Sequence, residues 1–598
     1  MAMSGTRKAI LIFCGIFAAL ILVAVIGVAA LWLMFSKAEP SIRDNSVLVL
    51  RVSGSLPDYT PDDPFKKFFG GPDQSLTGLV MQFKKAKVDR RIKGILLDIN
   101  MSGVGWGKAE ELRDAIADFR SSGKPVYAYI ELGMNKEYYI ATACDKIFVP
   151  PPGELFINGL AADVMFFRGS LDKLGIYPDI YQIGKYKSVG DMFTQKQMTD
   201  AHREYINSML DDLFNRYVNT IAQARHKTPE EVRTLIDNAP YDADKAKEAG
   251  LIDEAMYRDQ VDNELKKLLG QKETDTLAAV RGVDYRDVSP ESLGLNKGER
   301  IAVIYATGDI GSGSSQNSPS GDQSIGSDTV VKALNDATAD KNIKAIVLRV
   351  DSPGGSGLAS DIIWRAVDTA NQKKPVVVSM SDVAASGGYY ISASASKIVA
   401  QPSTITGSIG VVAGKPVMRG FYDWIGISNE YVLRGKTSGM FRETEKFSDE
   451  ERAKFEEWIK TTYYSDFIPK VAKGRGKDPE FVDSVGQGRV WTGAQAKDRS
   501  LVDEFGGLDK AIEVAKQLAK IPAEKGVERV ILPYPTTFLE QLLYGSTENA
   551  NTQVEQQQRA VAAALPEDAR RALRFMALMD RMKNGETMLV MPFDLRVK

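Results

Sequence analysis

The chain has 598 residues, of which 44% are hydrophobic and 26% are charged, and its formal net charge is -2. This length exceeds what one hydrophobic core serves, so two or more domains are expected. The balanced charge argues against a nucleic-acid-binding protein, because binding to a phosphate backbone requires a basic surface. The two cysteines, Cys14 and Cys144, cannot build a disulfide framework.

The histidines argue against two further classes of function. His202 and His226 are the only histidines, and neither lies in a metal-ligand spacing or beside a plausible nucleophile. We expect both to be surface residues of helices. The sequence therefore predicts no metal and no cofactor, and it disfavours a serine–histidine–aspartate triad.

An uncharged run of 28 residues occupies 9–36, between Lys8 and Lys37. At about 1.5 Å per helical residue it is long enough to cross a hydrocarbon core of about 30 Å. Cleaved signal sequences have a shorter apolar core of roughly 7–15 residues. The run therefore predicts a retained transmembrane anchor. Arg7 and Lys8 favour a cytoplasmic N-terminus, which leaves the rest of the chain on the extracytoplasmic side.

The chain contains two copies of one domain. The stretch DRRIKGILLDI at 89–99 reappears as DKNIKAIVLRV at 340–350, with five of eleven positions identical and an offset of 340 − 89 = 251. At the same offset, YYIATACDKI at 138–147 matches YYISASASKI at 389–398. Such matches in the same order indicate a duplication with a period far too long for a solenoid repeat.

Each copy has the pattern of parallel βαβ units. A short β-branched run is followed by an amphipathic helix, a buried strand, another helix and another strand, which predicts an α/β fold. The expected strands are 46–52, 94–99 and 126–130 in the first copy and 301–306, 345–350 and 376–380 in the second.

Changes in composition give the domain boundaries. We expect a cytoplasmic N-terminus at 1–8, the anchor at 9–36, a first repeat at 45–285, a second repeat at 298–530 and a tail at 531–598. Residues 308–326 are rich in Gly, Ser and Pro and lack a phosphate-binding loop motif, so they are expected to form a mobile loop. In the tail, 549–559 reads as a linker and 566–583 as helix-like, before a short apolar end.

Comparison of the copies singles out two glycine-rich turns in the second. Ser-Gly-Gly at 386–388 lies opposite Asn-Lys-Glu at 135–137, and SPGG at 352–355 lies opposite MSGV at 101–104. A fold that required small residues at 386–388 would not accept Lys and Glu at the matching positions. The small residues of the second repeat therefore point to chemistry rather than packing.

The two turns together could build an acyl-transfer site. Attack on an amide requires an exposed hydroxyl, a base, and backbone N–H groups that hold the oxyanion. Ser386 would supply the hydroxyl. Gly387, at the start of an expected helix, and Gly354 with Gly355, after a buried strand, would supply the N–H groups.

Several motifs resemble those of the protease IV, or signal peptide peptidase A, family of serine peptidases. They are SDVAASGGYYIS at 381–392, STITGSIGVV at 403–412, the DSPGG loop at 351–355 and GKYKSVGDMF at 184–193. The resemblance extends from the anchor to about residue 530 and leaves the role of the tail open. It implies a Clp protease/crotonase-like fold in each half, and a bacterial protein of the cytoplasmic (inner) membrane.

The resemblance also implies a serine/lysine dyad whose two members come from different halves. Matched motif by motif, Ser386 is the nucleophile, Lys187 the base, and Ser408 the serine that orients the lysine. A lysine base requires a pKa far below its usual value of about 10.4, which burial can produce. Family members form homo-tetramers over the membrane and cut apolar signal-peptide remnants, so peptide substrates, a membrane and other copies of the chain are the expected partners.

Lys436 is a rival for the role of base, because it lies in the same repeat as Ser386 and single-domain relatives take their lysine from that repeat. The offset of 251, however, places Lys436 opposite Lys185 and Ser438 opposite Lys187. We therefore expect the first repeat to supply the base through Lys187.

Two other functions stay open at the level of sequence. One is a non-catalytic, membrane-tethered scaffold, and the other is acyl-CoA chemistry on a crotonase-like fold. Acyl-CoA chemistry is disfavoured because its substrate is cytoplasmic, whereas the body of the chain is expected outside. A membrane-anchored serine endopeptidase is the preferred interpretation.

Overall fold

The computed structural model describes residues 40–60, 74–317, 323–533 and 587–591, together with Leu22, Met582 and the backbone of 596–597. Among these residues no helix has the length and apolar character needed to cross a membrane. The expected anchor at 9–36, apart from Leu22, lies outside the described residues, as do the expected linker at 549–559 and nearly all of the helix-like stretch at 566–583.

The first repeat is built on a six-stranded parallel sheet with the order β10-β5-β3-β2-β1-β11. Its strands are β1 (Ser46–Gly54), β2 (Ile92–Ser102), β3 (Val126–Ile130), β5 (Lys146–Val149), β10 (Glu254–Ala255) and β11 (Ala279–Arg281). The three strands expected from the sequence form its centre, so the predicted α/β class is confirmed.

The second repeat has a corresponding eight-stranded sheet with the order β22-β20-β18-β16-β12-β24, in which β19 pairs with β18 and with β23. All its pairs are parallel except β20 with β22. Its strands are β12 (Glu299–Thr307), β16 (Ile343–Ser352), β18 (Val376–Ala385), β19 (Lys397–Ala400), β20 (Ile405–Gly407), β22 (Val490–Thr492), β23 (Glu504–Phe505) and β24 (Val527–Leu532).

Helices of the two repeats begin and end at positions that differ by the same offset of 251. In the first repeat α3 is Leu76–Val88 and α4 is Trp106–Arg120, and in the second α13 is Ser327–Ala339 and α14 is Gly357–Asn371. The buried residues recur at the same spacing and offset: they are Leu79, Phe83 and Ala86 in α3 and Val330, Leu334 and Ala337 in α13. This spacing places them on one helix face, where burial of a large side chain such as Phe83 contributes roughly 1.5–3 kcal/mol.

A third sheet joins the two repeats. It has the order β14-β15-β13-β17-β25-β21-β8, in which β8 comes from the first repeat and β25 from the tail. Its strands are β8 (Tyr177–Ile183), β13 (Asp309–Gly311), β14 (Gln316–Asn317), β15 (Gln323–Gly326), β17 (Gly354–Ser356), β21 (Val411–Val417) and β25 (Met588–Val590). The repeats are therefore connected through hydrogen bonds between main chains.

Three strands, β13, β14 and β15, form within the stretch 308–326, so the prediction of a loop is wrong for them. These strands form in a Gly/Ser-rich stretch because main-chain hydrogen bonding requires no large side chains. Small residues also allow neighbouring backbones to approach closely. A Cβ on Gly308, whose φ is +99°, would lie 1.8 Å from the Gln323 carbonyl oxygen.

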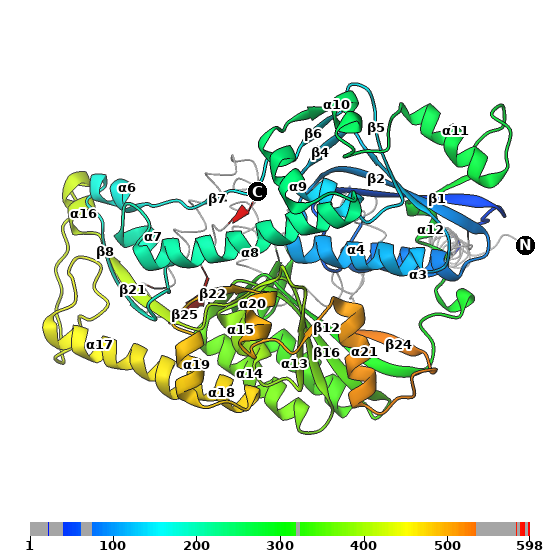
Figure 1. The fold of residues 1–598 in the computed structure, drawn as a ribbon. Coiled ribbons are helices and arrows are strands. Elements are labelled where there is room, and N and C mark those ends of the chain that lie inside the picture. Colours follow the sequence, from blue (N-terminus) through cyan, green and yellow to red (C-terminus); the bar gives the residue numbers. More distant parts are fainter. Residues whose placement is uncertain are drawn as a thin grey trace, which may run out of the picture.

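Helix α8 (Asp200–Ala224) runs along the boundary between the repeats, with the first repeat above it and the second below in Figure 1. Its Asp212 accepts a hydrogen bond from Thr492 Oγ1 at 2.7 Å, and the carbonyl of its Ser208 accepts one from Gln495 Nε2 at 2.9 Å. The helix thereby connects the first repeat to β22 and to helix α20 (Gly493–Asp498), which follows it.

The remaining elements surround these sheets. In the first repeat they are β4 (Leu132–Met134), α5 (Asn135–Ala141), β6 (Glu154–Phe156), β7 (Ala162–Asp163), α6 (Arg168–Lys173), α7 (Asp191–Thr194), α9 (Pro229–Asp237), β9 (Tyr241–Asp242), α10 (Ala243–Glu248), α11 (Arg258–Leu269), α12 (Gly282–Tyr285) and η1 (Glu291–Leu293). In the second repeat and tail they are α15 (Gly387–Ser392), α16 (Arg419–Ile425), α17 (Asp449–Thr461), η2 (Thr462–Phe467), α18 (Ile468–Arg475), α19 (Pro479–Val485), α20 (Gly493–Asp498), α21 (Leu508–Leu518) and β26 (Arg596–Val597).

The two histidines differ from each other. His226 is exposed, in the turn after α8, as a surface position was expected to be. His202 is fully buried, which contradicts the expectation, and its ring stacks on that of Tyr205 with centroids 5.3 Å apart. Burial lowers the pKa of His202 to about 4, so its ring is neutral at ordinary pH and packs as an aromatic residue.

Candidate active site

Ser386 lies in the sharp turn between β18 and α15. Its φ of 55° and ψ of -110° lie outside the regions that residues with a Cβ usually adopt. Its backbone N–H donates to the Gly407 carbonyl at 2.8 Å, and its carbonyl accepts from the Tyr390 N–H at 2.8 Å. A strained serine held from both sides of a strand-to-helix turn is typical of a functional position.

Lys187 reaches this serine from the first repeat. Its Nζ lies 2.7 Å from Ser386 Oγ, 3.1 Å from Ser408 Oγ and 3.2 Å from the Ser408 carbonyl oxygen. The structure therefore brings together the three side chains that the sequence motifs singled out, and all three are fully buried.

The main chain around Lys187 is fixed by the second repeat. The Tyr186 N–H donates to the Gln487 carbonyl at 2.8 Å. A Cβ on Gly488 would lie only 2.5 Å from Lys187 Cβ, so only glycine allows this approach. The lysine is thus placed by contacts between the repeats.

The environment of Lys187 favours the neutral amine. Burial lowers the pKa of the Lys187 side chain well below its usual value of 10.5. An amine without its proton can accept one from a serine hydroxyl, which is the requirement for a general base.

Burial of Ser386 contradicts the expectation of an exposed hydroxyl, because its exposed fraction is 0%. The serine lies where the two repeats meet, in contact with Lys187 and beside the glycine strand β17, along which β25 of the tail pairs. A Cβ on Gly354 would lie 1.9 Å from the Leu589 carbonyl oxygen.

The two glycine turns face each other. A Cβ on Gly354, whose φ is +109°, would lie 2.8 Å from the Gly387 nitrogen. The Gly354 N–H donates to Ser352 Oγ at 3.1 Å. Gly355 instead lies in β17, where it pairs with Ile310 on one side and Leu589 on the other. A Cβ on Gly387 would in turn lie 3.1 Å from the Gly354 Cα and 3.1 Å from the Gly355 nitrogen, so all three expected glycines lie close together.

Neither of the alternative lysines, Lys185 and Lys436, contacts Ser386 in the structure. Lys185 is exposed and lies 3.8 Å from the Glu204 carboxylate, with its Nζ over the Tyr186 ring. Lys436 is exposed in the segment after α16.

In the first repeat, the corresponding turn is closed by its own side chains. Glu137 accepts hydrogen bonds from the Ser102 N–H at 2.8 Å and from Ser102 Oγ at 2.7 Å. Lys136 Nζ donates to the Val104 carbonyl at 2.8 Å. Lys136 and Glu137, which replace the Gly-Gly of the second repeat, thus form hydrogen bonds with the loop at 102–104. In the second repeat the corresponding loop is the one expected to bind the oxyanion.

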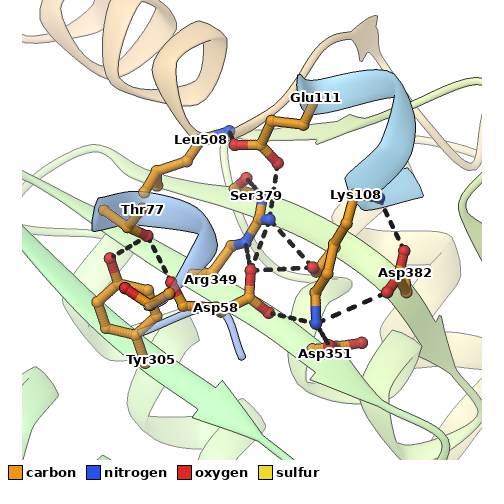
Figure 2. Close-up of polar contacts among 12 residues, drawn as sticks. Asp58, Thr77, Lys108, Glu111, Tyr305, Arg349, Asp351, Ser379, Asp382 and Leu508 are labelled. Carbon is orange, nitrogen blue, oxygen red and sulfur yellow. Dashed lines mark hydrogen bonds and ion pairs between the residues drawn. The ribbon is translucent and has the colours of Figure 1, made fainter. Parts of the chain in front are cut away.

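A buried charge network joins the two repeats (Figure 2). Arg349, from β16, donates to Asp58 at 2.7 Å and to Glu111 at 2.7 Å, both of the first repeat. Burial raises the pKa of Asp58, but the charges of Arg349 and Lys108 outweigh it and lower that pKa to about 2.

Lys108 of α4 completes the network from the first repeat. Its Nζ lies 2.8 Å from Asp351, which directly precedes the SPGG turn, and 3.6 Å from Asp382. Asp382 in turn accepts the N–H groups of Gly105 and Lys108 at 3.0 and 2.8 Å, so a residue of the second repeat caps the N-terminus of α4. Burial raises the pKa of Asp351 to about 6, against the opposing charge of Lys108.

Sequence reasoning missed this network. A signal was present, because Arg349 interrupts an apolar buried strand, and Asp351 and Asp382 lie just before the two glycine turns. Charged residues in buried strands require partners, but nothing in the sequence names them.

A strained serine against a buried lysine amine, beside facing glycine turns on an α/β fold, defines a serine peptidase. The chain belongs to peptidase family S49, whose model matches residues 118–272 and 368–522, once in each repeat.

Long relatives match most of the chain. The chloroplastic serine protease SPPA of Arabidopsis thaliana is 37% identical over 514 residues, which cover 86% of this chain and 75% of the relative. Protease 4 of Salmonella typhi is 34% identical over 506 residues, covering 81% and 80%. Among solved structures, a ClpP1 mutant from Listeria monocytogenes overlays with a TM-score of 0.23 and 17% identity, covering 35% of this chain and 92% of that one.

Proposed function

We propose that this chain is a serine endopeptidase with a Ser386/Lys187 dyad, in which the second repeat supplies the nucleophile and the first supplies the base. The observation that carries the proposal is the distance of 2.7 Å between Lys187 Nζ and Ser386 Oγ within a fully buried site.

The geometry supports one sequence of steps. The neutral amine of Lys187 takes the proton of Ser386 Oγ as that oxygen attacks the substrate carbonyl carbon. Backbone N–H groups of the two glycine turns, that of Gly387 with those at Gly354 and Gly355, stabilise the oxyanion, and Ser408 holds the lysine in line through its 3.1 Å contact. The lysine ammonium then gives its proton to the leaving amine, the C–N bond breaks, and water hydrolyses the acyl-enzyme.

The two repeats have separate tasks in this proposal, each on a Clp protease/crotonase-like domain. The first repeat, with its glycine turn closed by Glu137, is a non-catalytic partner that delivers Lys187. Strand β8 ends four residues before Lys187 and pairs with β21, where Val411 lies opposite Ile183. Strand pairing between the repeats therefore fixes the distance between base and nucleophile.

For substrates and setting, we propose apolar peptides such as signal-peptide remnants, cut at the extracytoplasmic face of the bacterial cytoplasmic membrane by a tethered homo-tetramer. The uncharged run at 9–36 supports the tether. Exposed apolar side chains after α15 support contact with other copies of the chain, since Trp424 is 72% and Val432 is 85% exposed.

A soluble fragment that begins at Asp44 tests the proposal. It should hydrolyse apolar leader-type peptides, and a serine-directed acylating probe should label Ser386 in the fragment but not in its Ser386→Ala variant. A folded fragment with neither cleavage nor labelling would contradict the dyad and favour a non-catalytic scaffold.

A further inference from the structure

The strand that leads to the nucleophile changes register shortly before it ends. Between β16 and β18, Val350 lies opposite Met380, but Ser352 lies opposite Ala384. One residue of β16 therefore faces three residues of β18, at 381–383. A bulge of this kind bends a strand and changes the direction of the side chains that follow it. The position of the nucleophile turn consequently depends on what fixes these three residues.

Within the second repeat, Asp351 binds the bulge that lies opposite it. Its Oδ1 atom accepts the Val383 N–H at 3.1 Å, and its carbonyl accepts the Gly308 N–H at 2.9 Å. Asp351 also directly precedes the SPGG turn. One carboxylate therefore links the end of β16, which leads to the glycine turn, with the bulge that leads to the nucleophile.

The first repeat binds the same bulge through the N-terminus of α4. Besides the two N–H groups of α4 that Asp382 accepts, two glycines of this helix start lie against the bulge. A Cβ on Gly105 would lie 2.2 Å from Asp382 Cγ, and a Cβ on Gly107 would lie 2.7 Å from the Ser381 carbonyl oxygen. Glycine at both positions therefore allows α4 to approach β18 this closely.

Lys108 is the cation shared by the two strand ends. Figure 2 shows its side chain extending from α4 toward three carboxylates, with Nζ 2.8 Å from Asp351, 3.6 Å from Asp382 and 3.7 Å from Asp58. Burial disfavours the charge of Lys108, but the charges of the three carboxylates outweigh it and raise its pKa above 10.5. Because the cluster is buried, solvent screens these attractions only weakly. The ammonium thus holds together two carboxylates that would otherwise repel each other.

The reverse arrangement is missing from the fold. At the offset of 251, the positions that match the cation and its two carboxylates at the strand ends are Ala359, Asn100 and Glu131. Ala359 carries no charge, and Glu131 is exposed. The first repeat nevertheless forms the corresponding parallel pair of strands, β2 with β3. The strand pair can therefore form without such a cluster, which occurs on the strands that lead to the nucleophile.

We propose that Lys108 is a positioning residue for peptide hydrolysis. By holding Asp351 and Asp382 together, it fixes the glycine turn relative to Ser386, so that the oxyanion donors face the carbonyl that the serine attacks. The proposal rests on the proposed function. The first repeat then makes two contributions to the reaction, the base Lys187 and the alignment of the oxyanion donors.

The proposal predicts which kinetic constant changes. Oxyanion donors act on the transition state, because the negative charge on the carbonyl oxygen develops only there. Loss of the shared cation should let the two turns shift relative to each other, and small misplacements of this kind lower turnover by about 10–100-fold. The affinity for the substrate in its ground state should change little, so KM should stay within about twofold of the parent value.

The test compares turnover per active site in the full chain and in Lys108→Met. A serine-directed acylating probe, taken to completion, counts the sites with a reactive Ser386, and kcat for an apolar leader-type peptide is divided by that count. This division separates positioning from folding, since a purely structural role would lower the number of labelled sites or the melting temperature but not the turnover of each labelled site. The variant should show a kcat per labelled site about 10–100-fold lower, with KM unchanged.

Asp382→Asn provides a second variant that keeps the size of the side chain and an oxygen for the α4 N–H groups. It should also lower kcat per labelled site, and the double variant with Lys108→Met should lose less than the product of the two single losses, because both remove one interaction. If Lys108→Met does not fold, Asp382→Asn carries the test.

Lys85→Met is the matched control. Lys85 is a buried lysine of α3, and its Nζ donates to the carbonyls of Tyr285, Arg286 and Val288 at 2.9, 3.0 and 2.8 Å, all within the first repeat. This substitution should lower the melting temperature and leave kcat per labelled site unchanged.

Three results would overturn the proposal. The first is a normal turnover per labelled site in folded Lys108→Met and Asp382→Asn. The second is a change confined to KM, which would indicate a role in substrate binding. The third is an equal loss of turnover in Lys85→Met, which would show that lower stability alone slows the reaction. A parent chain that neither cleaves the peptide nor is labelled at Ser386 would instead contradict the proposed function.

Discussion

Lys187 and Ser386 lie 199 positions apart in the chain, yet their Nζ and Oγ atoms are 2.7 Å apart. The lysine follows a strand of the first repeat and the serine follows a strand of the second. The pairing of β8 with β21 and the close packing of Gly488 on Lys187 create this contact. Activity should therefore depend on the first repeat even though its own glycine turn is closed.

Replacing the base should abolish most activity. Lys187→Ala is expected to lower kcat/KM for peptide hydrolysis by about 10²–10⁴, the usual contribution of a general base. Lys436→Ala and Lys185→Ala should change it only modestly, because both side chains are exposed. Thermal melts should first establish that each variant is folded. An inactive Lys436→Ala beside a near-normal Lys187→Ala would show that the dyad lies within one repeat.

The pH dependence of activity should report the lowered pKa of Lys187. The base works only without its proton, so kcat/KM should rise with pH and level off at a pH well below 10.5. Steady-state assays from pH 5 to pH 10 on a substrate without titratable groups would measure this limb. A midpoint near 10.5 would mean that burial does not favour the neutral amine.

The same burial should cost stability. Between the lowered pKa of folded Lys187 and its usual 10.5, the unfolded chain binds more protons, so the stability contribution of this group increases as pH rises. Lys187→Met should therefore raise the free energy of unfolding at neutral pH, by about 1.4 kcal/mol for each unit of pKa shift. The gain should shrink as pH approaches 10.5. Urea unfolding of both proteins at pH 6.5 and pH 9 would measure this difference in the free energy of unfolding and its change with pH. A difference that increases with pH would contradict this account.

The charge network should be sensitive to loss of Lys108. Lys108→Met leaves Asp351 and Asp382 without their shared cation, and removal of one partner from a buried ion pair typically costs about 3–5 kcal/mol. The control is Lys87→Met on α3, which removes an exposed pair with Asp118 and should cost under about 1 kcal/mol. Denaturant unfolding compares the two. Equal losses would show that the network contributes no more than a surface pair.

Much of the fold could be predicted because its signals are local. The strand runs near 46–52 and 345–350 and the helices between them follow from residue spacing, and the duplication follows from matches at one offset. Ser386 and its glycines were found because Ser-Gly-Gly at 386–388 lies opposite Asn-Lys-Glu at 135–137, and Lys187 and Ser408 were found through the resemblance to the protease IV family. By contrast, strands β13 and β15 in a Gly/Ser-rich stretch were missed, because main-chain pairing leaves little trace in side-chain pattern.

Periodicity and internal comparison, which are properties of the chain alone, were enough to predict the two α/β repeats and the glycine turns around Ser386, whereas Lys187 was identified as the candidate base through the motif that resembles protease IV. The tertiary structure was needed to show that Lys187 contacts Ser386, that His202 is buried, and that β25 of the tail pairs with the glycine strand β17. These features depend on surfaces that meet across hundreds of residues, where packing and backbone pairing between distant segments set the distances.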